Sequence, residues 1–204
     1  MPADEVLFDE ASHTYTVNGM EYPSVSAVLS LFADYSRVPR AVLEFKRKIG
    51  KFAHRCIELY ETGELDVDTV DEAVMPYLHS WVNFRTVKPL RVVAAEKIVY
   101  SKKHRYAGRL DLIVEFTDDP ETLWLLDAKC VYAMDPATAL QTAGYAQAWN
   151  ENEETRVKKR AGLQLKPDGG MAELYPYRNK TDFNIFSNAL NLHHWMRNNN
   201  RRTA

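Results

Sequence analysis

The sequence predicts an α/β (α+β) fold in which a central mixed β-sheet is flanked by helices. Residues 92–129 contain three runs rich in β-branched and aromatic residues, separated by KKHR and TDDPE, which is the pattern of an antiparallel meander. An Ala-rich helical run and two strand-like runs joined by Pro-Asp-Gly-Gly follow at 135–177. Apolar residues recur at helical spacing before and after these segments. Together they predict a sheet that is antiparallel at first and is then extended by an αβ unit.

Composition places the chain among globular proteins. The 204 residues are 46% hydrophobic and 26% charged, with a net charge of −2. No apolar run reaches 18 residues and the N-terminus has no apolar leader, so we expect neither membrane association nor secretion. Cys56 and Cys130 lie far apart without a CxxC motif, which predicts a reducing compartment and no iron–sulfur cluster.

The elements divide one expected domain, 1–204, into three parts. Residues 1–36 should form a hairpin, turning at Asn18-Gly19, and a helix capped by Ser24. Residues 37–180 form the core, which begins with helices over 37–61 and 69–88; Gly50 could also mark a separate helix start. Residues 181–204 should be an amphipathic helix and a tail, its apolar stripe running from Phe183 to Met196.

Three acids should lie nearly abreast in the meander. Asp111 and Asp127 are each eight residues from Asp119, in the middle of one turn, and Glu96 and Asp111 bracket the middle of the other. Tight hairpins would therefore align the three carboxylates on adjacent strands. Asp127 and Lys129 would share their face because side chains alternate with a period of two.

Clustered carboxylates on a half-apolar face need a partner. They repel each other more strongly as water is excluded, and Mg²⁺ is a frequent remedy. A lysine beside such a metal can orient water and offset phosphate charge. The ordinary alternative is a sheet whose polar face is solvated, since exposed acids are the norm.

Further candidates lie on the flanking helices. Gly50, His54 and Glu58 are spaced by four residues along one helix face, as are Gln141 and Tyr145 on another. The stretch 37–55 carries seven cations against Glu44 and is the best candidate for a phosphate-tracking surface.

The ordered set of Gly50-x3-His54-x3-Glu58, Glu96, Gly108-Arg-Leu-Asp111, Asp127-Ala-Lys129 and Gln141-x3-Tyr145 resembles the PD-(D/E)XK nuclease superfamily, in its RecB-like and lambda-exonuclease-like branch. The resemblance covers about residues 49–177. It implies a restriction-endonuclease-like core and a small phage-type exonuclease, located in the cytoplasm of a bacterial or phage-infected cell, with an organelle matrix as the alternative.

The resemblance also implies site roles. His54, Asp111, Asp127 and the backbone carbonyl of Ala128 would bind Mg²⁺, with Mn²⁺ able to substitute, and Glu96 would serve a second metal or position water. Lys129 would polarise the attacking water, making Lys129, Asp127, Asp111 and Glu96 the catalytic set. DNA would contact Gln141, Tyr145, Arg109, Arg55, Lys51, Lys48 and Arg47.

The expected function is therefore metal-dependent DNA hydrolysis in recombination, repair or replication, most simply by an exonuclease. A separate helicase, single-strand-binding or annealing protein is the expected partner. Two alternatives stay open: a catalytically inactive nuclease-fold module that binds DNA and recruits such a partner, and an RNA-directed nuclease.

Overall fold

The computed structural model describes residues 4–12, 14–34 and 36–200. Its centre is a mixed five-stranded sheet in the order β4-β5-β6-β7-β8, formed by β4 (Leu90–Ser101), β5 (Tyr106–Phe116), β6 (Asp119–Lys129), β7 (Val157–Gln164) and β8 (Glu173–Tyr177). β4, β5 and β6 form the predicted antiparallel meander, β7 runs parallel to β6, and β8 returns antiparallel to β7. The predicted α/β class with a mixed sheet is confirmed.

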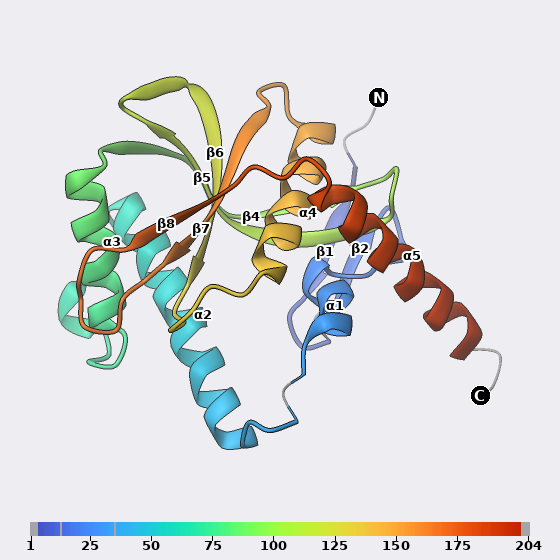
Figure 1. The fold of residues 1–204 in the computed structure, drawn as a ribbon, viewed down its shortest axis with the longest axis horizontal. Coiled ribbons are helices and arrows are strands. Elements are labelled where there is room, and N and C mark those ends of the chain that lie inside the picture. Colours follow the sequence, from blue (N-terminus) through green and yellow to red (C-terminus); the bar gives the residue numbers. More distant parts are fainter. Residues whose placement is uncertain (1–3, 13, 35, 201–204) are drawn as a thin grey trace.

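Helices cover both faces of this sheet (Figure 1). α2 (Arg40–Thr62) and α3 (Met75–Val87) pack on one face, over a buried cluster that includes Leu112, Val114 and Leu126. α1 (Val25–Leu29), α4 (Ala137–Asn152) and α5 (Asp182–Asn200) pack on the other face, over Ile113, Leu123 and Leu125. The alternation of apolar residues along β5 and β6 therefore supplies two cores, one on each side of the sheet.

The N-terminal segment forms a small antiparallel sheet of its own. Its strands are β1 (Val6–Asp9), β2 (Thr14–Val17) and β3 (Met20–Tyr22). Asn18 and Gly19 both have positive φ, at 50° and 76°, as a tight turn of this type requires. The predicted hairpin is thus present, with a third strand added by β1. Ser24 then caps α1 through its side chain, which accepts from the Ala27 N–H at 3.0 Å, and the short 3-10 helix η1 (Ser30–Phe32) follows.

α2 is one continuous helix, so Gly50 lies inside it and marks no separate start. The predicted end is confirmed, since Gly63 has φ 74° and its N–H bonds back to the last turn. The next helix starts later than predicted: the 3-10 helix η2 (Val67–Thr69) comes first, and Pro76 lies in the first turn of α3.

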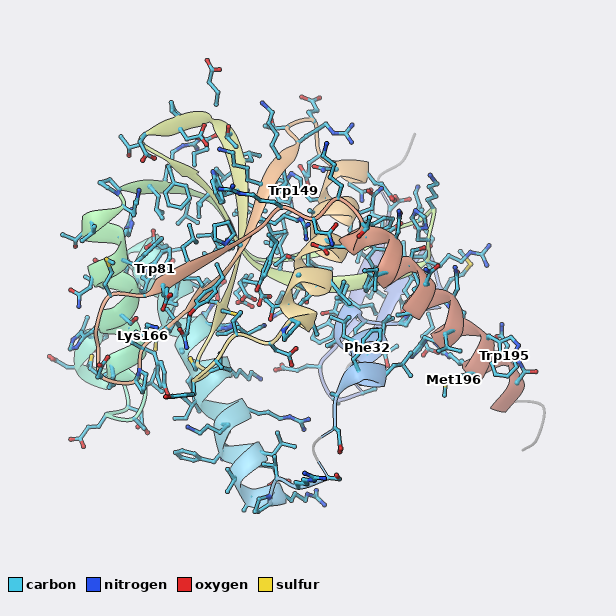
Figure 2. All side chains as sticks on the ribbon, in the orientation of Figure 1. Phe32, Trp81, Trp149, Lys166, Trp195 and Met196 are labelled. Atoms are coloured by element: carbon cyan, nitrogen blue, oxygen red, sulfur yellow. The ribbon has the colours of Figure 1, made fainter. Side chains whose placement is uncertain are left out.

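α5 departs from its prediction toward its end. Phe186 and Leu190 are buried against α4 and the sheet, but Trp195 is 63% exposed and Met196 is 38% exposed. Figure 2 shows both side chains near the end of the helix that points away from the body. The sequence predicts an apolar stripe as far as Met196, yet only the first half of the stripe is buried. The predicted tail begins at residue 198, but the helix continues to Asn200, and residues 201–204 lie outside the described residues.

Candidate metal centre

The predicted register of the meander is confirmed. Lys97 pairs with Leu110 and Ala95 with Leu112, which places Glu96 opposite Asp111. Leu112 pairs with Leu126, which puts Asp111 and Asp127 abreast one step further along. The turn between β5 and β6 is shorter than predicted, because β6 already begins at Asp119. The pairing of the two strands shifts by a β-bulge or irregularity between Glu115 and Phe116.

Glu96 has an unusual backbone for a strand residue. Its φ is 48°, in the left-handed region that costs a non-glycine residue roughly 1–3 kcal/mol. The pairing of β4 with β5 is continuous on both sides of Glu96, and its register shift lies between Val92 and Ala94. Leu110 packs with Ile113 on the α4 face, whereas the two-residue alternation of side chains predicts that it shares a face with Leu112. Glu96 and Asp111 both face His54 of α2.

His54 of α2 meets the two acids from above the strands. Its Nδ1 lies 3.5 Å from both Glu96 Oε1 and Asp111 Oδ1, and its Nε2 lies 2.8 Å from the Ala128 carbonyl oxygen. Because a carbonyl can only accept, Nε2 carries the proton of this bond. In the neutral ring, Nδ1 is then the bare nitrogen that faces the carboxylates, which is the arrangement of a metal-binding histidine oriented by a backbone carbonyl.

These three side chains could hold a metal ion. One potential ligand atom from each of His54, Glu96 and Asp111 lies within 4.8 Å of the others. The other oxygen of Asp111 is fixed by the Ala128 N–H at 2.7 Å. Ala128 therefore uses both backbone groups to orient the ligands, and whether its carbonyl also binds the metal, as expected from the resemblance, stays a prediction.

Asp127 is buried beside this group and forms an ion pair with Lys129, Oδ2 to Nζ, at 2.6 Å. Within the described part of the chain, neither Asp127 oxygen has a partner in good hydrogen-bond geometry. Buried carboxylates rarely remain so poorly satisfied. Asp127, a predicted metal ligand, is not among the three side chains whose potential ligand atoms lie within 4.8 Å of one another, but its oxygen that does not face Lys129 has no partner in the described residues.

Burial and mutual repulsion dominate the protonation of the acids. Burial raises the pKa of Asp127 to about 6, assisted by the charge of Asp111 and opposed by Lys129. Burial also raises the pKa of Asp111 above its usual range. Burial acts to lower the pKa of His54, but the charge of Asp111 and a hydrogen bond to Glu96 outweigh it and raise the pKa to about 9. Protons and the His54 cation therefore offset the charge of the acids, and a metal ion could take over that role.

Gln141 and Tyr145 are adjacent on α4 as their spacing predicted. Gln141 Nε2 donates to the Tyr145 hydroxyl at 3.3 Å. Tyr145 is only 4% exposed, and burial raises its pKa well above 10. The Tyr145 ring explains Gly108, because a Cβ at that position would lie 2.6 Å from its Cε1 atom. Gln141 lies closer to solvent, so contact of this pair with DNA would begin there.

A cleft of about 510 Å³ leads to Lys129. Gln141 and Thr138 of α4, Arg47 of α2 and Phe32 of η1 border it. Arg47 and Gln141 were predicted from the sequence, but Phe32 was not. Its side chain is 55% exposed, and this exposure becomes visible only in the structure. Figure 2 shows Phe32 beside α1, apart from the main sheet.

The other predicted DNA-binding cations lie further out. Lys51 pairs with Glu10 at 2.6 Å and Arg55 with Glu58 at 2.5 Å. The Arg109 guanidinium lies over the Phe8 ring at 5.2 Å. Lys48 is exposed on α2. None of these four residues lines the cleft that leads to Lys129, and three of them already have a partner on the protein.

Sequence reasoning also overlooked Tyr177 of β8. Its hydroxyl oxygen would lie 2.8 Å from a Cβ at Gly162, the residue that pairs with Asp127. Burial and the charge of Asp127 raise the pKa of Tyr177 to about 12. The register of the β7–β8 hairpin would have indicated it, because Tyr177 pairs with Arg160, two residues before the Gly162 that pairs with Asp127.

No family model and no curated protein matches the chain. Within the described residues, no helix is both long and apolar enough to cross a membrane.

Proposed function

We propose that the protein is a metal-dependent deoxyribonuclease with a restriction-endonuclease-like core, acting as an exonuclease of the PD-(D/E)XK type. One observation carries the proposal: three strands and α2 bring Glu96, Asp111, Asp127, His54 and Lys129 together, with Asp111 and Asp127 buried and the other three side chains 19–25% exposed. Burying that many ionisable groups is costly unless they serve a bound ion or a reaction.

His54, Glu96 and Asp111 would hold a divalent ion, with Asp127 offering a further oxygen. Oxygen ligands with a single imidazole suit Mg²⁺ or Mn²⁺. A bound ion would supply a Lewis acid that polarises the phosphoryl oxygen and acidifies a water molecule. No cysteine ligand lies in this group, which favours a mononuclear or dinuclear oxygen site over an iron–sulfur cluster.

The protein's own residues would prepare this chemistry. The Ala128 N–H and carbonyl fix Asp111 and His54 in place before any ligand arrives. The pKa of Lys129 is raised, because Asp127 and Asp111 outweigh the effect of burial, so the ammonium stays charged at neutral pH. A fixed ammonium beside the reacting phosphate would stabilise the charge that develops during in-line attack by water.

The cleft bordered by Arg47, Gln141 and Phe32 is the proposed route of the DNA strand to Lys129. Arg47 would neutralise a phosphate, and the exposed ring of Phe32 would offer a surface on which a base can stack. A helicase, a single-strand-binding protein or an annealing protein acting as a separate chain would supply such a strand.

Digestion of end-labelled DNA with Mg²⁺ or Mn²⁺ tests the proposal. Wild-type protein should degrade DNA, Asp127→Asn should lose at least about 10²-fold in rate, and Glu115→Gln should behave as wild type. Glu115 is the matched control, since it lies on β5 but pairs with Arg91 at the surface. A circular substrate in the same assay separates exonuclease from endonuclease action.

Calcium and a ribo-oligonucleotide discriminate the alternatives. A metal-dependent nuclease should bind DNA in Ca²⁺ without cutting it. Retention of DNA with no degradation in any metal would instead establish a binding module, and preferential degradation of the ribo-oligonucleotide would establish an RNA-directed enzyme.

A further inference from the structure

A second cleft, of about 700 Å³, lies beside the C-terminal half of α4. Its other walls are the start of β7, the end of β8 with Pro176, and the segment between β8 and α5 with Asn179. Figure 1 shows α4, β7 and the β8–α5 connection gathered at this part of the sheet. Neither His54 nor any of the three aligned acids borders this cleft.

The cleft has a strongly one-sided charge. The cations that border it are Lys158, Lys159, Arg160, Arg178 and Lys180, and no Asp or Glu side chain is among its lining residues. In a chain with a net charge of −2, this concentration is not a consequence of overall composition. A concave surface of one sign focuses the field and attracts a ligand of opposite charge.

Part of this charge is already offset by the protein. Lys159 pairs with Asp119 at 2.8 Å, and Arg160 pairs with Asp182 at 2.9 Å while also donating to the Ala139 carbonyl. Arg160 is therefore structural. Among the described residues, Arg178 and Lys180 form no ion pair, and Lys158 only donates to the Glu121 carbonyl at 3.3 Å. Three cations thus remain available to an external anion.

The cleft lies along the strand that borders the candidate metal centre. Gly162 of β7 pairs with Asp127, and Lys158 and Arg160 precede Gly162 on the same strand. A strand rises about 3.3 Å per residue, so these positions lie roughly 7–13 Å from the acidic end. Tyr177 borders the cleft and pairs with Arg160, while its hydroxyl lies near Gly162.

We propose that this cleft binds the phosphodiester backbone of a nucleic-acid strand outside the catalytic centre, with Arg178 and Lys180 as its main phosphate contacts. The available cations are spread over β7 and the β8–α5 connection, which suits a polyanion with repeated phosphates better than one compact phosphate group. The inference rests on the proposed function for its choice of ligand. It adds a second contact that would hold the strand while the metal centre acts.

The test is oligonucleotide binding in Ca²⁺, measured by fluorescence anisotropy at several salt concentrations. Arg178→Ala/Lys180→Ala should weaken binding of a long single strand at least about fivefold and reduce the salt dependence by about 1.4 in log–log slope, since each phosphate contact on a single strand contributes about 0.7. The matched control is Lys88→Ala/Lys103→Ala, which removes the same charge from exposed positions elsewhere and should stay within about twofold of wild type.

Equal losses in the two double variants, or no loss in either, would overturn the inference. The inference would also fail if inorganic phosphate bound in the cleft without weakening oligonucleotide binding, because the site would then take a small anion.

A cleavage assay in Mg²⁺ separates the two proposals. At saturating concentration, Arg178→Ala/Lys180→Ala should cut a short oligonucleotide at the wild-type rate. If wild-type protein binds DNA through this cleft but cuts nothing, only the nuclease proposal fails.

Discussion

At the scale of single residues, the proposed chemistry depends on the pair of Asp127 and Lys129. The Asp127 side chain is fully buried and that of Lys129 is 25% exposed. Asp127 Oδ2 lies 2.6 Å from Lys129 Nζ, and the other Asp127 oxygen has no donor in the described structure. A purely structural ion pair would be expected to satisfy its remaining lone pairs. The unsatisfied oxygen is a further observation in favour of the proposed metal site.

Replacing Lys129 by methionine should remove the fixed charge but keep the packing of the stem. We expect DNA hydrolysis to fall at least about 10²-fold, as for other transition-state electrostatic contacts, while Mn²⁺ binding persists. The matched control is Lys102→Met, on a surface lysine paired with Asp4. Single-turnover rates decide, and a Lys129→Met rate within threefold of wild type would contradict the role.

Gly108→Ala should destabilise the protein by about 1–3 kcal/mol, because the new methyl group would overlap the Tyr145 ring. Gly50→Ala is the control, since nothing lies within 4 Å of a Cβ there and the helix should gain about 0.5–1 kcal/mol. Urea unfolding measures both. Adding Tyr145→Leu should recover part of the Gly108→Ala loss, and strictly additive effects would show that the two residues do not interact.

At the scale of elements, α2 must be held in place because it supplies His54. Its last turns are fixed to α3 by Glu61, whose Oε1 accepts from the Trp81 indole at 2.8 Å and from Arg85 at 3.0 Å. Arg85 also donates to the carbonyl oxygen of Leu90, which is the first residue of β4. This network ties the helix that carries His54 to the strand that carries Glu96, and Figure 2 shows Trp81 on the α2–α3 side of the sheet.

Glu61→Ala should therefore cost roughly 3 kcal/mol of stability, because it leaves the Trp81 indole and the Arg85 guanidinium without their acceptor. Glu64→Ala, one turn later and exposed, should change stability by less than about 0.5 kcal/mol. Thermal and urea denaturation of the two variants make the comparison. Similar losses in both would mean that Glu61 does not fasten α2.

Much of this element-level organisation was predictable from local patterns. The register of the meander followed from residue spacing, because tight hairpins leave little freedom in pairing. The left-handed Glu96, the exposed end of α5 and the position of Arg178 and Lys180 beside the basic start of β7 were not predictable. Each depends on which other elements lie nearby, and local sequence does not encode that. The candidate site was predicted as a set of residues, whereas the roles of Ala128 in orienting His54 and Asp111 required the coordinates.

For the whole molecule, an overall charge of −2 means that binding of nucleic acid depends on local surfaces. Arg47 borders the cleft that leads to Lys129 and, among the described residues, forms no ion pair. Arg47→Glu should weaken DNA binding in Ca²⁺ by about tenfold or more, because it removes a phosphate contact and adds repulsion. Lys103→Glu, with the same charge change at the β4–β5 turn, should have an effect of less than about threefold. Equal effects in the anisotropy assay would indicate a general charge effect and no defined route.

The most direct test of the central claim is a crystal structure of the protein soaked with Mn²⁺, with the ion located by anomalous scattering. The account predicts a peak within bonding distance of His54 Nδ1, Asp111 and Glu96 or Asp127, and its loss in Asp111→Asn. Two results would contradict the assignment of this cluster as a metal centre. One is a fully bound ion elsewhere, and the other is the absence of a peak at saturating Mn²⁺ while His54 stays paired with the acids.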